Sequence, residues 1–158
     1  MVDFHAVKEV VIDASPEAVF SIVSDFSKHR ELAGSGELVS VRLLTQGPTD
    51  IGTTIEADES IDLGDEHLDI TAKAVVVACS PPNTLSWVAV PPLPIRRIQW
   101  WFNLSAEGSG TKVVHECEVD LGEEGRAMFG GTQAYNDTRG ADVIAGMEKT
   151  LQNLKGMV

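Results

Sequence analysis

The chain has 158 residues, 43% of them hydrophobic, and its 24 acidic side chains against 12 Lys and Arg produce a net charge of −12. This length predicts one domain, residues 1–158, and the charge argues against nucleic acid or an anionic membrane surface as a partner. No apolar run approaches the roughly 18 residues of a membrane helix, and charged residues interrupt the N-terminus, so we expect no membrane insertion, no signal peptide and a cytoplasmic location.

The first predicted elements are a strand and a short helix. The apolar run at residues 6–13 is typical of a strand, and Ser15 and Pro16 then have the properties of an N-cap and a first helical residue. The following apolar side chains recur at helical spacing: Val19, Ile22, Val23 and Phe26. Two turns are marginal in isolation, so we predict that this helix closes one end of a larger body. A second short helix or turn follows in residues 27–39.

The middle of the chain is predicted to be an antiparallel meander. Six strand-like runs are separated by short breaks rich in Gly and Pro: 38–45, 53–63, 68–79, 84–90, 95–105 and 111–121. Such short links permit hairpins and exclude parallel crossovers, which need a dozen or more residues.

The last part of the chain changes to a helical period. Residues 138–156 are predicted to form one long helix with a shared apolar face: Ile144, Met147, Leu151, Leu154 and Val158. At 1.5 Å per residue, about 28 Å of helix would cross a sheet of six or seven strands. The segment 122–137 before it is predicted to be a long loop, and because it holds Met128 and Phe129 beside two glycines, we expect it to gate a cavity.

These elements, in this order, resemble the START-like (SRPBCC) superfamily, in particular its bacterial polyketide cyclase/dehydrase-like branch. The similarity rests on "IDASPEAVFSIVSDFSKH" (12–29), Gly52, "VVVACSPPNTLSW" (75–87), "LSAEGSGTKVVHE" (104–116) and "GMEKTLQNLKGMV" (146–158). It implies an α+β helix-grip fold, in which a curved antiparallel sheet of six to seven strands surrounds the C-terminal helix and two short N-terminal helices close one end. It also implies an elongated apolar cavity between sheet and helix.

Strand alternation sorts the side chains that would face such a cavity. His115 shares a face with apolar residues, where it is either a satisfied core histidine or a ligand contact that titrates near 6.5. Glu59 also shares an apolar face, unless a bulge shifts the register. Trp100 is predicted to point inward and Trp101 outward. The candidate ligand-binding residues are Trp87, Trp100, Phe102, His115, Glu59, Phe129, Tyr135 and Met147, and the aromatic ones could equally be solid core.

Motifs for catalysis are few. The four histidines form no HxH or HExxH pattern, so we expect no metal and no cofactor, and Cys79 and Cys117 are predicted to be small buried thiols. The acidic segment 56–69 is expected to be a solvated hairpin. Together with Trp101, it is the candidate surface for a protein partner.

Three functions are therefore considered. The first is binding of a hydrophobic or amphipathic small molecule, such as a lipid, polyketide-like or isoprenoid compound. The second is a polyketide cyclase/aromatase in which His115 or Glu59 moves protons. The third is a protein-interaction module of the toxin–antitoxin or chaperone-cofactor type. A hydrophobic ligand is the expected partner for the first two.

Overall fold

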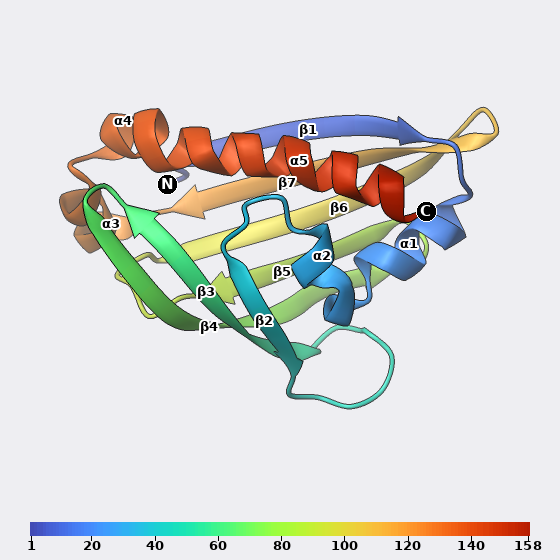
Figure 1. Ribbon diagram of the computed structural model, residues 1–158, viewed down its shortest axis with the longest axis horizontal. Helices are drawn as coiled ribbons and strands as arrows, with labels where there is room; N and C mark the ends of the chain where they lie inside the picture. The colour runs from blue at the N-terminus through green and yellow to red at the C-terminus, as the bar shows by residue number, and fades with distance from the viewer.

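A curved sheet of seven antiparallel strands forms the body of the computed structural model, which describes residues 1–158 (Figure 1). Its strands are β1 Phe4–Ile12, β2 Leu38–Leu43, β3 Thr54–Leu63, β4 Glu66–Ser80, β5 Thr84–Val90, β6 Arg97–Glu107 and β7 Gly110–Asp120. The spatial order is β1-β7-β6-β5-β4-β3-β2. The predicted meander is therefore confirmed, and the first strand completes the sheet by pairing with the last one.

Two short helices and a turn close one end of the sheet, as the apolar stripe predicts. They are α1 Pro16–Val23, the 3₁₀ turn Phe26–Lys28 and α2 His29–Leu32. The Ser15 hydroxyl caps α1 by accepting a hydrogen bond from the Ala18 amide at 3.2 Å. All four stripe residues are buried, so the short helix is stabilised by tertiary packing.

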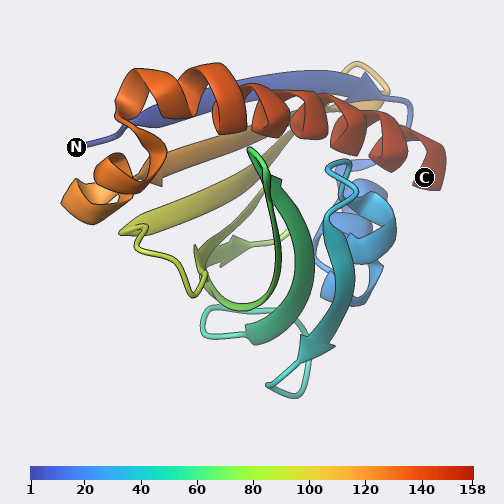
Figure 2. The same ribbon diagram turned by 60° about the vertical axis from the view of Figure 1, so that its left-hand side comes forward.

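The long C-terminal helix α5, Ala141–Met157, lies along the concave face of the sheet (Figure 2). It buries Met147, Leu151 and Leu154, whereas Ile144 is only partly buried and Val158 is exposed. The predicted helical face is thus right in its centre and wrong at its last residue, which lies beyond the final turn. None of the helices is both long and apolar enough to cross a bilayer.

The segment 122–137 is not the loop that the sequence predicted. It folds into α3 Gly122–Phe129 and α4 Thr132–Tyr135, and a π-helical turn at Asn136–Gly140 leads directly into α5. Gly130 and Gly131 separate α3 from α4, and both have positive φ (81° and 109°), a conformation that glycine adopts at little cost.

The buried carboxylate of Asp3 holds these helices in place. It accepts hydrogen bonds from the Leu121 amide (2.9 Å), the Arg126 guanidinium (3.1 Å) and the Thr132 hydroxyl, and the Asp3 carbonyl accepts another from Asn136. Burial alone would raise the pKa of Asp3, but these hydrogen bonds outweigh it and hold the pKa below its usual value. The start of the chain therefore ties down a segment more than a hundred residues away.

Replacing Leu151 by Ala tests the packing of α5. Leu151 is 4% exposed within the larger hydrophobic cluster, so we expect its truncation to lower the free energy of unfolding by about 2–5 kcal/mol. Lys155→Ala, on the exposed side of the same helix, should change it by less than about 0.5 kcal/mol. Urea melts of the two variants measure both values, and a Leu151→Ala loss as small as the control would contradict this packing.

Candidate functional site

A cavity of about 240 Å³ lies between the concave face of the sheet and α5. It is lined by members of both hydrophobic clusters, for example Phe102 from the larger one and Met147 from the smaller one. Voids between packed side chains are normally no larger than a water molecule, and an engineered cavity of about 150 Å³ already binds benzene. Because 24 of its 36 lining residues are hydrophobic, the space suits an apolar molecule.

All eight residues predicted from the sequence to bind a ligand line this one cavity. They are Glu59, Trp87, Trp100, Phe102, His115, Phe129, Tyr135 and Met147. β3 pairs with β4 without a register shift, so Glu59 keeps the inward face that alternation predicts. Trp101 points to the other face of the sheet, also as predicted, and is partly exposed there.

Aromatic rings from three neighbouring strands form one continuous wall of the cavity. The His115 ring lies on the Phe102 ring at 4.1 Å, nearly parallel, and the Trp100 ring is 5.4 Å from His115. Trp87 continues the row at 6.5 Å from Trp100. The register of β5, β6 and β7 produces this wall, since Trp87 pairs with Trp100 and Phe102 pairs with His115.

His115 is a satisfied histidine on the cavity wall. Its Nδ1–H donates to the Trp101 carbonyl at 2.9 Å, which leaves Nε2 as the acceptor nitrogen. Burial lowers the pKa of His115 to about 4, and nearby His29 contributes in the same direction. The expectation that His115 titrates near 6.5 is therefore wrong, because desolvation of the ring outweighs its hydrogen bond.

Sequence reasoning missed a second histidine at the cavity. His29 of α2 donates from Nε2 to the Val23 carbonyl at 2.8 Å and packs edge-on against Trp87 at 5.5 Å. Burial lowers the pKa of His29 to about 4 as well. Its place in the helix that was predicted to close one end of the body was a signal that it would face inward.

The cavity lining also contains a polar group, which consists of Glu37, Glu59 and Arg139. Arg139 donates two hydrogen bonds to the Glu37 carboxylate, at 2.5 and 2.7 Å. Burial raises the pKa of Glu59, and the negative charge of Glu37 raises it further, with Arg139 in partial opposition. Tyr135 lies beside this group, and burial raises the pKa of its phenol.

Arg139 and Glu37 were not identified from the sequence, although a signal existed. Tyr135, Arg139, Val143 and Met147 recur every four residues and all line the cavity. The pattern was missed because the final helix was expected to begin at residue 138, which separated Tyr135 from the rest.

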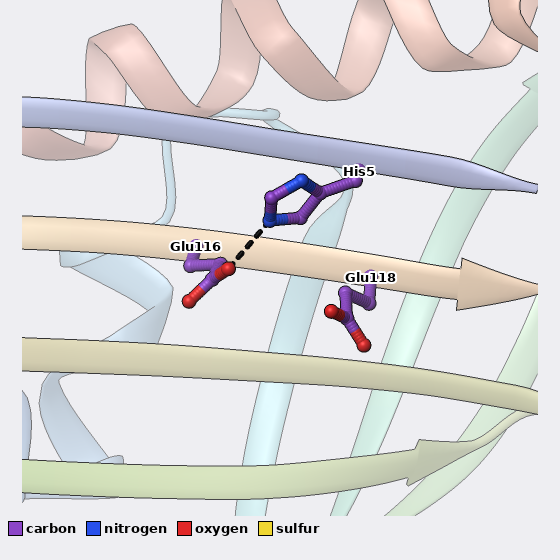
Figure 3. A group of neighbouring side chains, drawn as sticks. All are labelled: His5, Glu116 and Glu118. Carbon is purple, nitrogen blue, oxygen red and sulfur yellow. Dashed lines mark hydrogen bonds and ion pairs between the residues drawn. The ribbon is translucent and has the colours of Figure 1, made fainter. Parts of the chain in front are cut away.

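One group of side chains could hold a metal ion, and it lies on the outer face of the sheet, away from the cavity. Figure 3 shows His5 from β1 beside Glu116 and Glu118 from β7, with their ligand atoms all within 4.8 Å of one another. The group already makes bonds of its own: His5 contacts Glu116 at 2.5 Å and Arg97 donates to Glu118 at 3.0 Å. A cation would have to displace Arg97, so we assign no metal role here.

The two cysteines are free thiols with different exposure. Cys117 is fully buried on the cavity wall, as predicted, whereas Cys79 is half-buried and its thiol contacts the Thr49 carbonyl at 3.6 Å. Burial raises the pKa of both thiols, which disfavours the reactive thiolate.

One protein family matches the sequence of the chain, and several solved structures match its fold. A family model described as "Polyketide cyclase / dehydrase and lipid transport" matches residues 3–157. The di-domain ARO/CYC BexL from the BE-7585A biosynthetic pathway is 19% identical with a TM-score of 0.72, over 97% of this chain and 49% of BexL. StfQ, the di-domain ARO/CYC from the steffimycin pathway, is 11% identical with a TM-score of 0.75, over 98% and 50%.

A third solved structure has the length of this chain. Major latex-like protein 151 from Panax ginseng is 13% identical, with a TM-score of 0.65 over 97% of this chain and 95% of its own. The chain spans about half the length of the two di-domain proteins. No protein with a curated description matches it in sequence. At these identities the structures show a shared helix-grip fold, which confirms the predicted fold class. The family model, which matches nearly the whole chain, confirms the family resemblance.

Proposed function

Because the chain belongs to the polyketide cyclase/dehydrase and lipid transport family, we propose that it binds a hydrophobic or amphipathic small molecule, of the lipid, polyketide-like or isoprenoid kind, between the sheet and α5. The observation that carries this proposal is the cavity of about 240 Å³ with its largely apolar lining. Burial of an apolar ligand there would remove about 25 cal/mol of unfavourable hydration for each Å² of its surface.

Binding of a neutral apolar fluorophore tests the proposal. We expect N-phenyl-1-naphthylamine to bind with one-to-one stoichiometry and to quench tryptophan emission, because Trp87 and Trp100 line the cavity. Ala72→Phe, which would fill part of the space from β4, should weaken binding at least about tenfold. Its neighbour Thr71 is exposed on the opposite face, so Thr71→Phe is the matched control and should leave affinity unchanged.

The fluorophore experiment has a clear negative result. If wild-type protein and Thr71→Phe do not bind the fluorophore above background at micromolar concentration, the cavity does not take apolar ligands. Native mass spectrometry of freshly purified protein is an independent measurement, since a ligand acquired in the cell would add a discrete mass that Ala72→Phe loses.

A cyclase-type enzyme is the second candidate, and Glu59 is the observation that favours it. A carboxyl group with a raised pKa that faces an apolar cavity is suited to general acid–base catalysis. His115 is less suited, because its pKa of about 4 and its stacked ring leave it neutral and fixed in place.

A protein partner at the acidic hairpin 56–69 or at Trp101 stays a prediction without added support. Arg42 already pairs with Glu56 and Asp58, and His67 pairs with Asp62 and Asp69. Four of the seven carboxylates in the segment therefore already have a partner within the sheet itself.

A further inference from the structure

The Glu59 carboxyl is a polar group on the sheet side of the cavity that lacks a partner, as do Asp142 and Lys73 elsewhere in the lining. It makes no hydrogen bond and no ion pair, although it lines the space between β3 and α5. The nearby guanidinium of Arg139 directs both of its hydrogen bonds to Glu37 instead. The wall therefore presents an acceptor whose donor is not supplied by the protein.

The charge around Glu59 adds a second constraint on the ligand. The charged residues of the lining are Glu37, Glu59, Asp142, Arg139 and Lys73, three acids and two bases, with a net charge of −1 when all are ionised. Glu37 and Arg139 pair with each other and Lys73 is exposed, so the charge nearest Glu59 is negative. A ligand that displaces water from this region leaves the carboxyl desolvated, which is unfavourable unless the ligand donates a hydrogen bond or a positive charge. A carboxylate on the ligand would instead place a like charge against the group.

The aromatic wall, in contrast, favours an apolar part of the ligand. His29 and His115 are neutral there, and the apolar rings that line the wall are those of Trp87, Trp100 and Phe102. The cavity therefore has one acidic region and one aromatic region. A ligand that satisfies both has a polar donor at one position and an apolar chain or ring at another.

We propose that the ligand is an amphipathic amine or alcohol whose polar group donates to Glu59, and that the cavity discriminates against carboxylic acids such as fatty acids. This inference rests on the proposed binding function and specifies its ligand class. A charge-assisted hydrogen bond between an ammonium and Glu59 would be stronger than one from a hydroxyl, so amines should bind most tightly.

Three probes of equal chain length test the ligand class: decylamine, 1-decanol and decanoate, each displacing N-phenyl-1-naphthylamine at pH 7.5. In wild-type protein we expect decylamine to bind at least about tenfold more tightly than decanoate, with 1-decanol between them. Glu59→Gln keeps the shape and removes the charge, so it should reduce this ratio to about threefold or less. Glu56→Gln, three residues away on the outer face, should keep the wild-type ratio.

The possible failures are distinguishable. Equal affinity for decylamine and decanoate in wild-type protein, or tighter binding of decanoate, would overturn the ligand class while the binding function stands. An unchanged ratio in Glu59→Gln would overturn the assignment to Glu59. Failure of all three probes and of the fluorophore would overturn the binding function itself. The wild-type ratio needs no variant, so it decides the class even if Glu59→Gln folds poorly.

Discussion

Lowering the pH from 7.5 to 5 is expected to reduce the free energy of unfolding by about 4 kcal/mol through two buried histidines, His29 and His115. Burial lowers the pKa of each from 6.5 to about 4, and their hydrogen bonds to the Val23 and Trp101 carbonyls oppose this only in part. Both rings are held neutral by the cavity wall, because a charged ring there would be desolvated.

The sign of the effect follows from proton uptake. Between pH 6.5 and 4 the unfolded chain binds protons that the folded chain does not, so stability falls as the pH falls. Linkage gives about 2 kcal/mol for each histidine at pH 5, a large share of the 5–15 kcal/mol typical of a domain. Neighbouring carboxylates raise the pKa of exposed His67, and burial raises the pKa of Glu59, so these two groups act in the opposite direction.

Urea melts at pH 7.5 and 5 measure this prediction. His29→Gln and His115→Gln should each be less stable than wild type at pH 7.5, but each should lose about 2 kcal/mol less than wild type on acidification. His67→Gln is the control on an exposed histidine and should not reduce the acid sensitivity. An equal loss of stability on acidification in the wild-type protein, His29→Gln and His115→Gln would show that neither histidine is neutral because of burial.

Replacing Asp3 by Ala is expected to lower the free energy of unfolding by about 3–5 kcal/mol. The side chain of Asp3 is fully buried, and its removal leaves the Leu121 amide and the Arg126 guanidinium without their acceptor. We also expect faster hydrogen exchange across α3 and α4, because the anchor that joins them to β1 is lost.

Asp3→Asn removes the negative charge of the side chain and keeps its shape. The amide oxygen can still accept a hydrogen bond, so the loss should be smaller, about 1–3 kcal/mol. Glu124→Ala, on an exposed position of α3, should change stability by less than about 0.5 kcal/mol. Low protection of residues 122–135 in the unmodified protein would favour a mobile gate, as the sequence suggested, and would contradict the anchoring role of Asp3.

The cavity wall was predictable because strand alternation is a local property. In a strand, every second side chain faces the same way, so the inward faces of Trp100, His115 and Glu59 follow from the order of residues once the strands are recognised. The N-cap at Ser15 and the stripe of α1 are local in the same sense, since they depend on residues within four positions of each other.

The sequence by itself thus determined which strand residues share a face, and alternation placed Glu59, Trp87, Trp100, Phe102 and His115 at the cavity. The order of the elements, through its resemblance to a known family, indicated the helix-grip architecture. Only the tertiary structure decided the burial, the protonation state and the hydrogen-bond partners of those residues. The neutral state of His115, the lack of a partner for Glu59 and the helices at 122–135 depend on burial and on contacts from Arg139 and Asp3. Such contacts join residues about a hundred positions apart, and desolvation depends on everything packed around a group, so no pattern of neighbouring residues specifies them.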